Sequence, residues 1–295
     1  MLNYSTVFET MVGETAQYLI DNNLKTMVLG ISGGIDSTVT AAICYEVVRR
    51  FPKYNFRFIG VGLPCTTNSD DENDSAMKTM KAFCKNGDYW VENLQKEYML
   101  MKATCEQRLT STNISRGNIK ARLRMIYIYN IASVTGGLVM DTDNKSENAL
   151  GFYTIHGDQG DFNPIGGLWK SEVYGLAKYL VKMYEDELTF TGIKNAKISA
   201  LNAAITITPT DGNGVAVGGD MAQIAPGHTY EDVDDILSTY LEYIGHHSEE
   251  FQIAMNELYQ KYGEETVNMV LERHRKSEFK RKRLPIVIKR ELYEN

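Results

Sequence analysis

Residues 27–37 read MVLGISGGIDS and decide the fold. The apolar part, 27–31, predicts a buried strand, and the residues from 38 to 50 predict a helix behind it. The glycine pair between them suits a tight turn. A strand that passes through such a turn into a helix directs backbone N–H groups and the positive end of the helix dipole at one point. The segment 32–37 therefore predicts an anion site, with phosphate as the expected ligand.

The spacing of this turn differs from that of two common phosphate loops. It matches neither G-x-x-x-x-G-K-S/T nor the dinucleotide fingerprint G-x-G-x-x-G. Ser32, Asp36 and Ser37 instead place two hydroxyls and a carboxylate around the glycines, which suits a pyrophosphate group with its divalent cation. The loop resembles the pyrophosphate (PP) loop of the ATP pyrophosphatases, which cleave ATP to AMP and pyrophosphate. An ordinary strand-to-helix turn is the alternative reading.

Length and composition limit the classes of protein. The 295 residues suit one α/β domain, with or without an appendage. The net charge of −7, from 31 basic and 38 acidic residues, argues against a general nucleic-acid binder. Four cysteines form no C-x-x-C pair, and neither a secretory signal nor an apolar run of membrane-spanning length is visible. We expect a cytoplasmic protein that contacts no membrane.

Strands and helices are expected to alternate through the first 184 residues. The further strands expected are 56–63, 90–91 and 138–140, and the helices expected are about 8–20, 38–50, 70–84, 95–109, 118–135 and 170–184. This order predicts an α/β fold with a doubly wound parallel sheet, whose ligands bind beyond the carboxyl ends of the strands. The turn at Ser32 and the segment 141–143 both fall on that edge.

The C-terminal third is expected to differ from the sheet region. Residues 189–228 are rich in Gly, Thr, Asn and Ala, which predicts a flexible loop or insertion that could act as a lid over the site. Three helices are expected at about 229–244, 249–262 and 264–280. We interpret 1–295 as a single domain whose C-terminal segment, 229–295, is helical.

Residues 117–125, GNIKARLRM, form a second group of interest. On a helix, Arg122 lies within about 60° of Ile119, Ile126 and Tyr129. We therefore expect its guanidinium to emerge from the buried face, where it would bind an anion. The alternative is an arginine whose stem packs while its charged end reaches water.

Acidic and basic residues follow the fourth expected strand. Glu147 would begin a helix that faces the same edge as Asp36, so that the two carboxylates could share one Mg²⁺. By itself, Glu147 would more often be an ordinary acid of a first helical turn. The polar glycine loop 157–164 suits sugar hydroxyls, and Lys170 after it would be a mobile cation for a phosphate.

Together these segments are similar to those of NAD synthetases. The matching motifs, in the family's order, are 32–37, 117–122 with Arg124-Met125, 142–147, 151–154, 161–164, Lys170, Pro209-Thr210 and Lys280-Arg281. The resemblance implies a Rossmann-like fold of the adenine nucleotide alpha hydrolase type. It also implies a homodimeric ligase that amidates deamido-NAD with ammonia, through an adenylate, and forms NAD, AMP and pyrophosphate.

The resemblance also implies roles for individual residues. ATP contacts would come from Gly30, Ile31, Ser32, Gly33, Gly34, Ile35, Asp36, Ser37, Thr142, Lys170 and Thr210. Asp36 and Glu147 would bind Mg²⁺ and, with Lys170, act in catalysis, while Arg122, Asp161 and Lys280 would contact deamido-NAD. Free ammonia is the expected nitrogen donor, because no amidase domain is recognisable; a separate amidase partner that supplies the ammonia is the alternative. The apolar helix 123–134 is a possible dimer surface or part of the core.

The chain departs from the family pattern at three positions. The family often has lysine at Ile155, histidine at Phe279 and arginine at Gly62, so these positions bear on the affinity for substrate or on its identity. Two other readings stay open. A tRNA-modifying ligase would use the same loop and the basic run 273–290. A non-catalytic nucleotide sensor would bind ATP without turnover.

Overall fold

The computed structural model describes residues 2–65, 69–188, 196–210, 214, 219–244 and 249–282. Within these residues four strands form one parallel sheet in the order β3-β2-β1-β4. The strands are β1 (Thr26–Gly30), β2 (Arg57–Gly62), β3 (Tyr89–Val91) and β4 (Gly137–Val139). In register, Val28 of β1 pairs with Ile59 of β2 and with Val139 of β4. The expected parallel sheet is confirmed.

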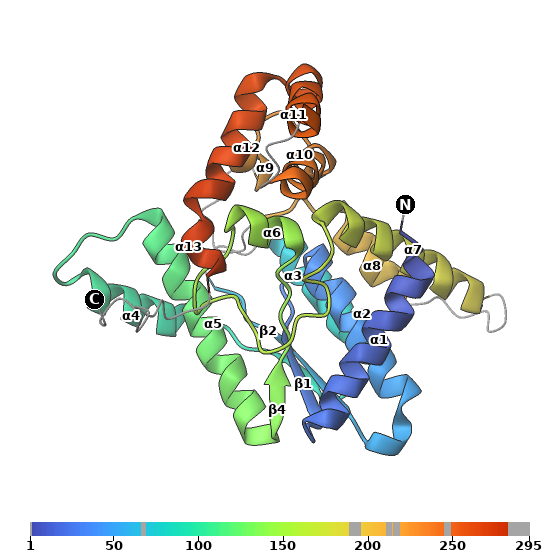
Figure 1. Ribbon diagram of the computed structural model, residues 1–295. Helices are drawn as coiled ribbons and strands as arrows, with labels where there is room; N and C mark the ends of the chain where they lie inside the picture. Colours follow the sequence, from blue (N-terminus) through green and yellow to red (C-terminus); the bar gives the residue numbers. More distant parts are fainter. Residues whose placement is uncertain are drawn as a thin grey trace, which may run out of the picture.

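Helices cover both faces of the sheet (Figure 1). The helices of the described residues are α1 (Tyr4–Asp21), α2 (Ile35–Arg50), the 3₁₀ turn η1 (Pro52–Tyr54), α3 (Asp70–Phe83), α4 (Gln95–Glu106), α5 (Asn113–Thr135), α6 (Lys145–Leu150), α7 (Lys170–Leu188), α8 (Ala196–Thr206), α9 (Met221–Ile224), α10 (Tyr230–Tyr243), α11 (Glu249–Tyr262), α12 (Glu264–Lys276) and α13 (Glu278–Arg281). Met27 and Leu29 of β1 pack with α1, α2 and α7, whereas Val28 packs with α5 on the opposite face. Alternate side chains of a strand point to opposite faces, so the sheet is doubly wound, as expected.

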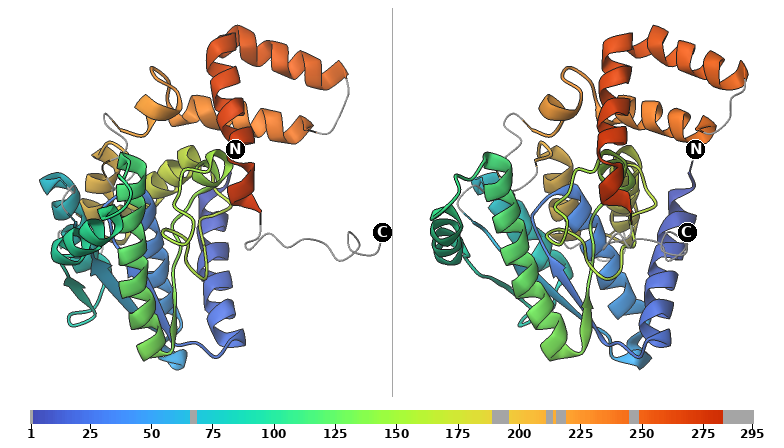
Figure 2. Two further views of the ribbon diagram at one scale, coloured as in Figure 1. Left: turned by 90° about the vertical axis from the view of Figure 1, so that its left-hand side faces the viewer. Right: turned by 60° about the vertical axis from the view of Figure 1, so that its left-hand side comes forward.

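The C-terminal helices form a lobe above the carboxyl ends of the strands (Figures 1 and 2). Their apolar cluster includes Val233 and Leu237 of α10, Leu258 of α11 and Val270 of α12. The three long helices lie within a few residues of their expected positions. No helix among the described residues has the length and apolar character needed to cross a membrane.

The expectation of a loop through 189–228 is wrong for part of that stretch. Residues 196–206 form α8, which packs against α3 and α7 and buries Ala200, Leu201 and Ala204 in the main core. A short helix, α9, follows at Met221–Ile224. The rest of the expected lid lies partly outside the described residues, at 189–195, 211–213 and 215–218.

The strand order places a crevice beside the turn after β1. The chain leaves β1 toward β2 and β3 and returns to the other side of β1 at β4. Loops that leave neighbouring strands in opposite directions part from one another, and ligands of open α/β sheets bind at that point. The Ser32 turn and the segment after β4 both lie there.

Candidate active site

The turn between β1 and α2 depends on a glycine in the left-handed region. Gly33 has a φ of +89°, and a Cβ there would lie 2.3 Å from the carbonyl oxygen of Glu72 on α3. Ser75 of α3 donates a hydrogen bond of 2.7 Å to the Gly33 carbonyl. Gly34 caps α2 without any side-chain hydrogen bond to the helix. The first amides of α2 thus remain available to an anion.

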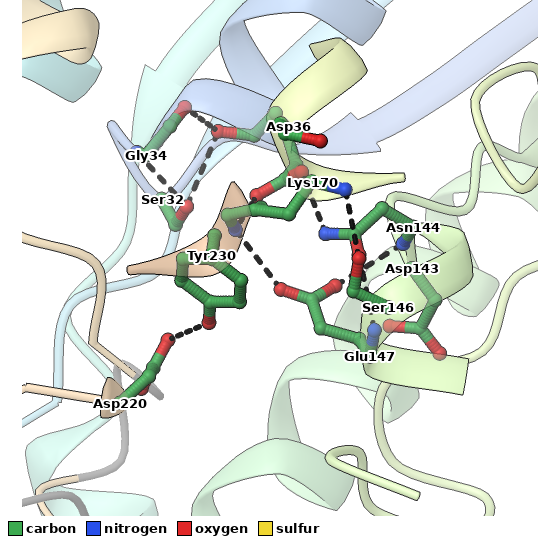
Figure 3. A network of polar contacts seen from close by, with 12 residues as sticks. Ser32, Gly34, Asp36, Asp143, Asn144, Ser146, Glu147, Lys170, Asp220 and Tyr230 are labelled. Atoms are coloured by element: carbon green, nitrogen blue, oxygen red, sulfur yellow. Dashed lines mark hydrogen bonds and ion pairs between the residues drawn. The ribbon is translucent and has the colours of Figure 1, made fainter. Parts of the chain in front are cut away.

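Lys170 lies between two carboxylates beside this turn (Figure 3). Its Nζ donates to Asp36 Oδ2 at 2.5 Å and to Glu147 Oε1 at 3.0 Å. Asn144 Nδ2 donates to Asp36 Oδ1 at 3.0 Å and, through its own side chain, caps α6, which carries Glu147. The structure thus brings together the three residues expected to act in catalysis, from α2, α6 and α7.

Burial and neighbouring charges together shift the pKa values of Glu147, Lys170 and Asp143. Burial raises the pKa of the Glu147 carboxyl to about 7, with Lys170 lowering and Asp36 raising that value. Burial opposes the charge of Lys170, but the two carboxylates hold the pKa of its ammonium well above the ordinary value. Burial, reinforced by Asp141 and Glu147, also raises the pKa of Asp143 well above its ordinary value. The site therefore keeps Lys170 cationic and favours a further cation near the carboxylates.

A buried carboxylate from the C-terminal lobe holds the segments that carry Lys170 and Glu147. Asp234 of α10 accepts hydrogen bonds from the Ser146 hydroxyl and, at 2.9 Å, from the backbone N–H of Ser171. The Ser146 hydroxyl oxygen in turn accepts from the backbone N–H of Lys170 at 2.8 Å. Asp234 is 4% exposed and joins the first turns of α6 and α7. Its role was missed because nothing in the sequence places α10 against these turns.

A cavity of about 690 Å³ opens in front of these groups. Most of the residues predicted to bind ATP line it, together with one of those predicted to bind deamido-NAD. The predicted residues in its lining are Gly30, Ile31, Ser32, Gly34, Ile35, Asp36, Ser37, Thr142, Glu147, Lys170, Thr210 and Lys280. Gly33 is not in the lining, because α3 covers it. Thr210 donates a hydrogen bond of 2.6 Å to Glu72 Oε1, which joins the segment after α8 to α3.

The expected orientation of Arg122 is wrong. The buried stripe of α5 includes Gly117, Ala121, Met125 and Ile128, so Arg122 is exposed and its guanidinium donates to the carbonyl of Ile155 at 3.1 Å. The stripe places Arg124 at the cavity instead, where its Nε donates to the Leu63 carbonyl at 3.0 Å. The spacing 117, 121, 124 and 128 is the sequence signal that could have identified Arg124.

The other two residues expected to contact deamido-NAD differ in position. Lys280 lines the cavity, where its Nζ donates to the carbonyl of Gly151 at 2.7 Å and to that of Tyr153. Asp161 lies outside the lining and accepts hydrogen bonds from the Tyr129 hydroxyl at 3.0 Å and the Val139 N–H at 2.8 Å. Sequence reasoning also missed Arg273, which reaches the cavity from α12.

Asp36 and Glu147 have the chemistry that a divalent cation requires. Mg²⁺ binds oxygen ligands and usually takes only one or two carboxylates from the protein, with phosphates and water completing its shell. Among the described residues no group of three or more His, Cys, Asp or Glu side chains could hold a metal. The two carboxylates therefore fit a metal that arrives with a phosphate substrate rather than one held by the protein alone.

Comparison with known proteins places the chain in a family. The family model described as NAD synthase matches residues 7–284. The chain is a member of the NAD synthase family. It is 38% identical, over 170 residues, to the NH₃-dependent NAD⁺ synthetase of Psychromonas ingrahamii, an alignment that covers 52% of this chain and 60% of that protein.

Solved structures share the family fold. The NH₃-dependent NAD synthetase of Campylobacter jejuni, solved with nitrate, superimposes with a TM-score of 0.68 at 26% identity, over 98% of this chain and 100% of that one. The NMN synthetase of Francisella tularensis has a TM-score of 0.72 at 22% identity, over 98% and 99% of the two chains, which shows a common fold.

Membership of the NAD synthase family does not favour the tRNA-modifying ligase. Three basic residues of the run 273–290 also have positions inside the molecule. In the described part of the run 273–290, Lys280 and Arg281 donate to backbone carbonyls of the molecule, and Arg273 lies at the cavity. Arg275, Lys276 and Lys282 of this run are exposed, and Lys276 and Lys282 form ion pairs with Glu272 and Glu278. Of the three departures from the family pattern, Gly62 lines the cavity, whereas Ile155 and Phe279, the latter 52% exposed, do not.

Proposed function

We propose that this NAD synthase family member catalyses the ATP-dependent amidation of deamido-NAD with ammonia, forming NAD, AMP and pyrophosphate. The observation that carries the proposal is the position of Lys170, within hydrogen-bond distance of Asp36 and Glu147 and beside the uncapped N-terminus of α2. This arrangement suits an enzyme that stabilises a leaving pyrophosphate.

In the first step, an oxygen of the nicotinate carboxylate attacks the α-phosphorus of ATP and pyrophosphate leaves. Negative charge grows on the leaving group, and the loop 32–37 and Lys170 are positioned to bind it. Mg²⁺ on Asp36 and Glu147 would neutralise further phosphate charge. Preorganised donors of this kind need no rearrangement as the charge develops, so they lower the barrier directly.

In the second step, ammonia attacks the acyl carbon of the adenylate and AMP leaves. No nucleophilic side chain is required, because the nitrogen nucleophile is a substrate. The protein orients the reactants and keeps water from the adenylate, which water would hydrolyse. We propose free ammonia as the nitrogen source and a cytoplasmic location, which suits the four cysteines, all free in the structure.

We propose that the exposed side of α5 contacts a second copy of the chain and also lies beside bound deamido-NAD. Ile126 and Val134 on this side are 66% and 79% exposed, and together they give α5 an apolar outer side that suits a homodimer contact. Arg122 belongs to this helix, and Asp161 accepts a hydrogen bond from Tyr129 of the same helix; neither lines the cavity. We propose that deamido-NAD extends from Lys280 toward them.

Oxygen transfer tests the adenylate step directly. Deamido-NAD labelled with ¹⁸O in its carboxylate is incubated with ATP, Mg²⁺ and ammonium, and AMP is examined by mass spectrometry. One ¹⁸O atom in each AMP is expected, because the carboxylate oxygen that attacks phosphorus leaves with AMP. AMP without label would contradict acyl adenylation, even if NAD were formed.

A further inference from the structure

Arg273 is a partly buried cation at the cavity that has no acceptor among the described residues. It lies on α12, and its guanidinium carbon lies 5.0 Å from the centroid of the Phe152 ring. Its Nε is buried with no hydrogen-bond partner in the part of the chain that the structure describes, and no ion pair of Arg273 is found there. The ring face lies beside the guanidinium, and no hydrogen bond from its N–H donors is found among the described residues.

The other cations of the lining are already engaged. Lys170 is bound by Asp36 and Glu147, Lys280 donates to two carbonyls, and Arg124 donates to Leu63. These contacts account for their charges within the described residues. Arg273 differs from them because its position at the cavity brings it no such acceptor.

The surroundings of Arg273 explain why an anion is needed. Burial lowers the pKa of its guanidinium, whereas the nearby Tyr230 and Asp220 raise it. The Asp220 carboxylate accepts a hydrogen bond from the Tyr230 hydroxyl at 3.1 Å (Figure 3). A guanidinium stays protonated when it is buried, so an acceptor that binds its N–H groups would offset the hydration lost at Nε.

We propose that Arg273 is a phosphate-recognition residue, whose guanidinium binds the non-bridging oxygens of a substrate phosphate in the cavity. The planar fork of arginine matches two such oxygens, and the Phe152 ring packs beside that fork, with its centroid 5.0 Å from the guanidinium carbon. The proposal rests on the proposed function, because the phosphate belongs either to the triphosphate of ATP or to the pyrophosphate bridge of the dinucleotide acceptor.

Phosphate bound to Arg273 would connect the two parts of the molecule. Arg273 belongs to the C-terminal lobe, whose apolar cluster includes Val270 and Leu271 of the same helix. The loop 32–37 belongs to the sheet. A ligand that contacts both would raise the thermal stability of the whole chain by mass action.

Binding measurements on matched variants test the proposal without turnover. Arg273→Met removes the guanidinium at the cavity, and Arg275→Met removes the same charge from the exposed side of α12. ATP with Mg²⁺, inorganic pyrophosphate and deamido-NAD are titrated separately by calorimetry, in the absence of ammonium. We expect Arg273→Met to weaken one class of ligand by about tenfold or more and Arg275→Met to change each by less than about twofold.

The ligand that responds identifies the phosphate. Weaker binding of ATP and pyrophosphate assigns Arg273 to the triphosphate, and weaker binding of deamido-NAD alone assigns it to the acceptor. Arg273→Lys keeps the charge but not the fork, so it should lie between the wild type and Arg273→Met. Unchanged affinities of Arg273→Met for all three ligands would overturn the proposal, while binding by the wild type would leave the proposed function standing.

Thermal melting separates recognition from a structural role. Without ligand, Arg273→Met should melt at the same temperature as the wild type or higher, because an unpaired buried charge is removed. The rise in melting temperature with saturating ligand should be smaller than in the wild type. A variant that is less stable without ligand, yet gains the full wild-type rise, would show a structural arginine and overturn the proposal.

Discussion

At the scale of single residues, Lys170 determines the state of the site. Its ammonium lies on both carboxylates that are proposed to hold Mg²⁺, with Nζ at 2.5 Å from Asp36 and 3.0 Å from Glu147. Its charge is maintained because the carboxylates outweigh the cost of burial. The same residue is therefore available as a cation for phosphate once a metal neutralises the carboxylates.

Replacement of Lys170 by methionine should reduce kcat about 10²–10³-fold, because one preorganised donor to the leaving group is lost. Lys178→Met is the matched control, since Lys178 lies on the outer side of the same helix. Steady-state kinetics with ATP as the varied substrate measures the effect. A Lys170→Met enzyme with the wild-type kcat would remove Lys170 from the chemical step.

Glu46 should make the free energy of unfolding depend on pH in the acidic range. Burial alone raises the pKa of its carboxyl, but hydrogen bonds from Arg49 and Arg50 outweigh burial and bring it below the ordinary 4.5. The unfolded chain then binds this proton at a higher pH than the folded chain. The stabilisation is present above the unfolded pKa and is lost as the pH falls through the folded pKa.

Glu46→Gln should therefore lower the free energy of unfolding by about 1–3 kcal/mol at neutral pH and flatten its decline in acid. Glu14→Gln, on the exposed side of α1, should change neither. Urea unfolding at several pH values measures the free energy of unfolding and its decline in acid for each variant. An equal loss of stability at pH 7 and at pH 3 would contradict the account.

Site residues could be predicted from the sequence where their place in the backbone pattern determines their position. Asp36 and Glu147 could be placed together from the sequence, because each follows a strand whose carboxyl end lies at the same edge of the sheet. Arg122 could not, because two stripes of α5 carry apolar residues. The stripe with Gly117 and Ala121 is the buried one, since small residues let the helix approach the sheet.

At the scale of elements, Asp234 couples α10 to α6 and α7. Its two oxygens accept from the Ser146 hydroxyl and the Ser171 N–H, at the turns that carry Glu147 and Lys170. Asparagine has the same shape but only one acceptor oxygen, so one of the two contacts would be lost. The position of the lysine thus depends on a helix of the C-terminal lobe.

Asp234→Asn should lower the free energy of unfolding by about 1–3 kcal/mol and reduce kcat, because a buried donor loses its acceptor beside Lys170. Glu242→Gln, exposed on the same helix, is the control and should do neither. Kinetics at a temperature where both variants are fully folded separates the two effects. Wild-type kcat in folded Asp234→Asn would show that Asp234 contributes stability alone.

One helix was missed because the composition of a long segment was read as a whole. The glycine-rich appearance of 189–228 hid α8, whose Ala200, Leu201 and Ala204 fill the core between α3 and α7. Small side chains give little apolar periodicity, and tertiary packing rather than propensity makes this helix. The sheet and the long helices were predictable because their apolar patterns are regular.

At the scale of the whole molecule, the outer side of α5 is the surface we assign to a second copy. Ile126→Glu should convert a dimer to a monomer, because a carboxylate at the centre of an apolar contact is desolvated without a partner. Ile253→Glu is the control, since Ile253 is 52% exposed on α11, in the C-terminal lobe. Light scattering after gel filtration gives the mass. A dimeric Ile126→Glu protein would exclude this side of α5 as the contact.

A single assay that measures all three products tests the proposed amidation. The protein is incubated with ATP, Mg²⁺, ammonium and deamido-NAD, and NAD, AMP and pyrophosphate are quantified together. We expect equal amounts of all three products from the wild type and none of them from Asp36→Ala. Absence of NAD while the wild type binds ATP would contradict the assignment of this protein as an ammonia-dependent NAD synthetase.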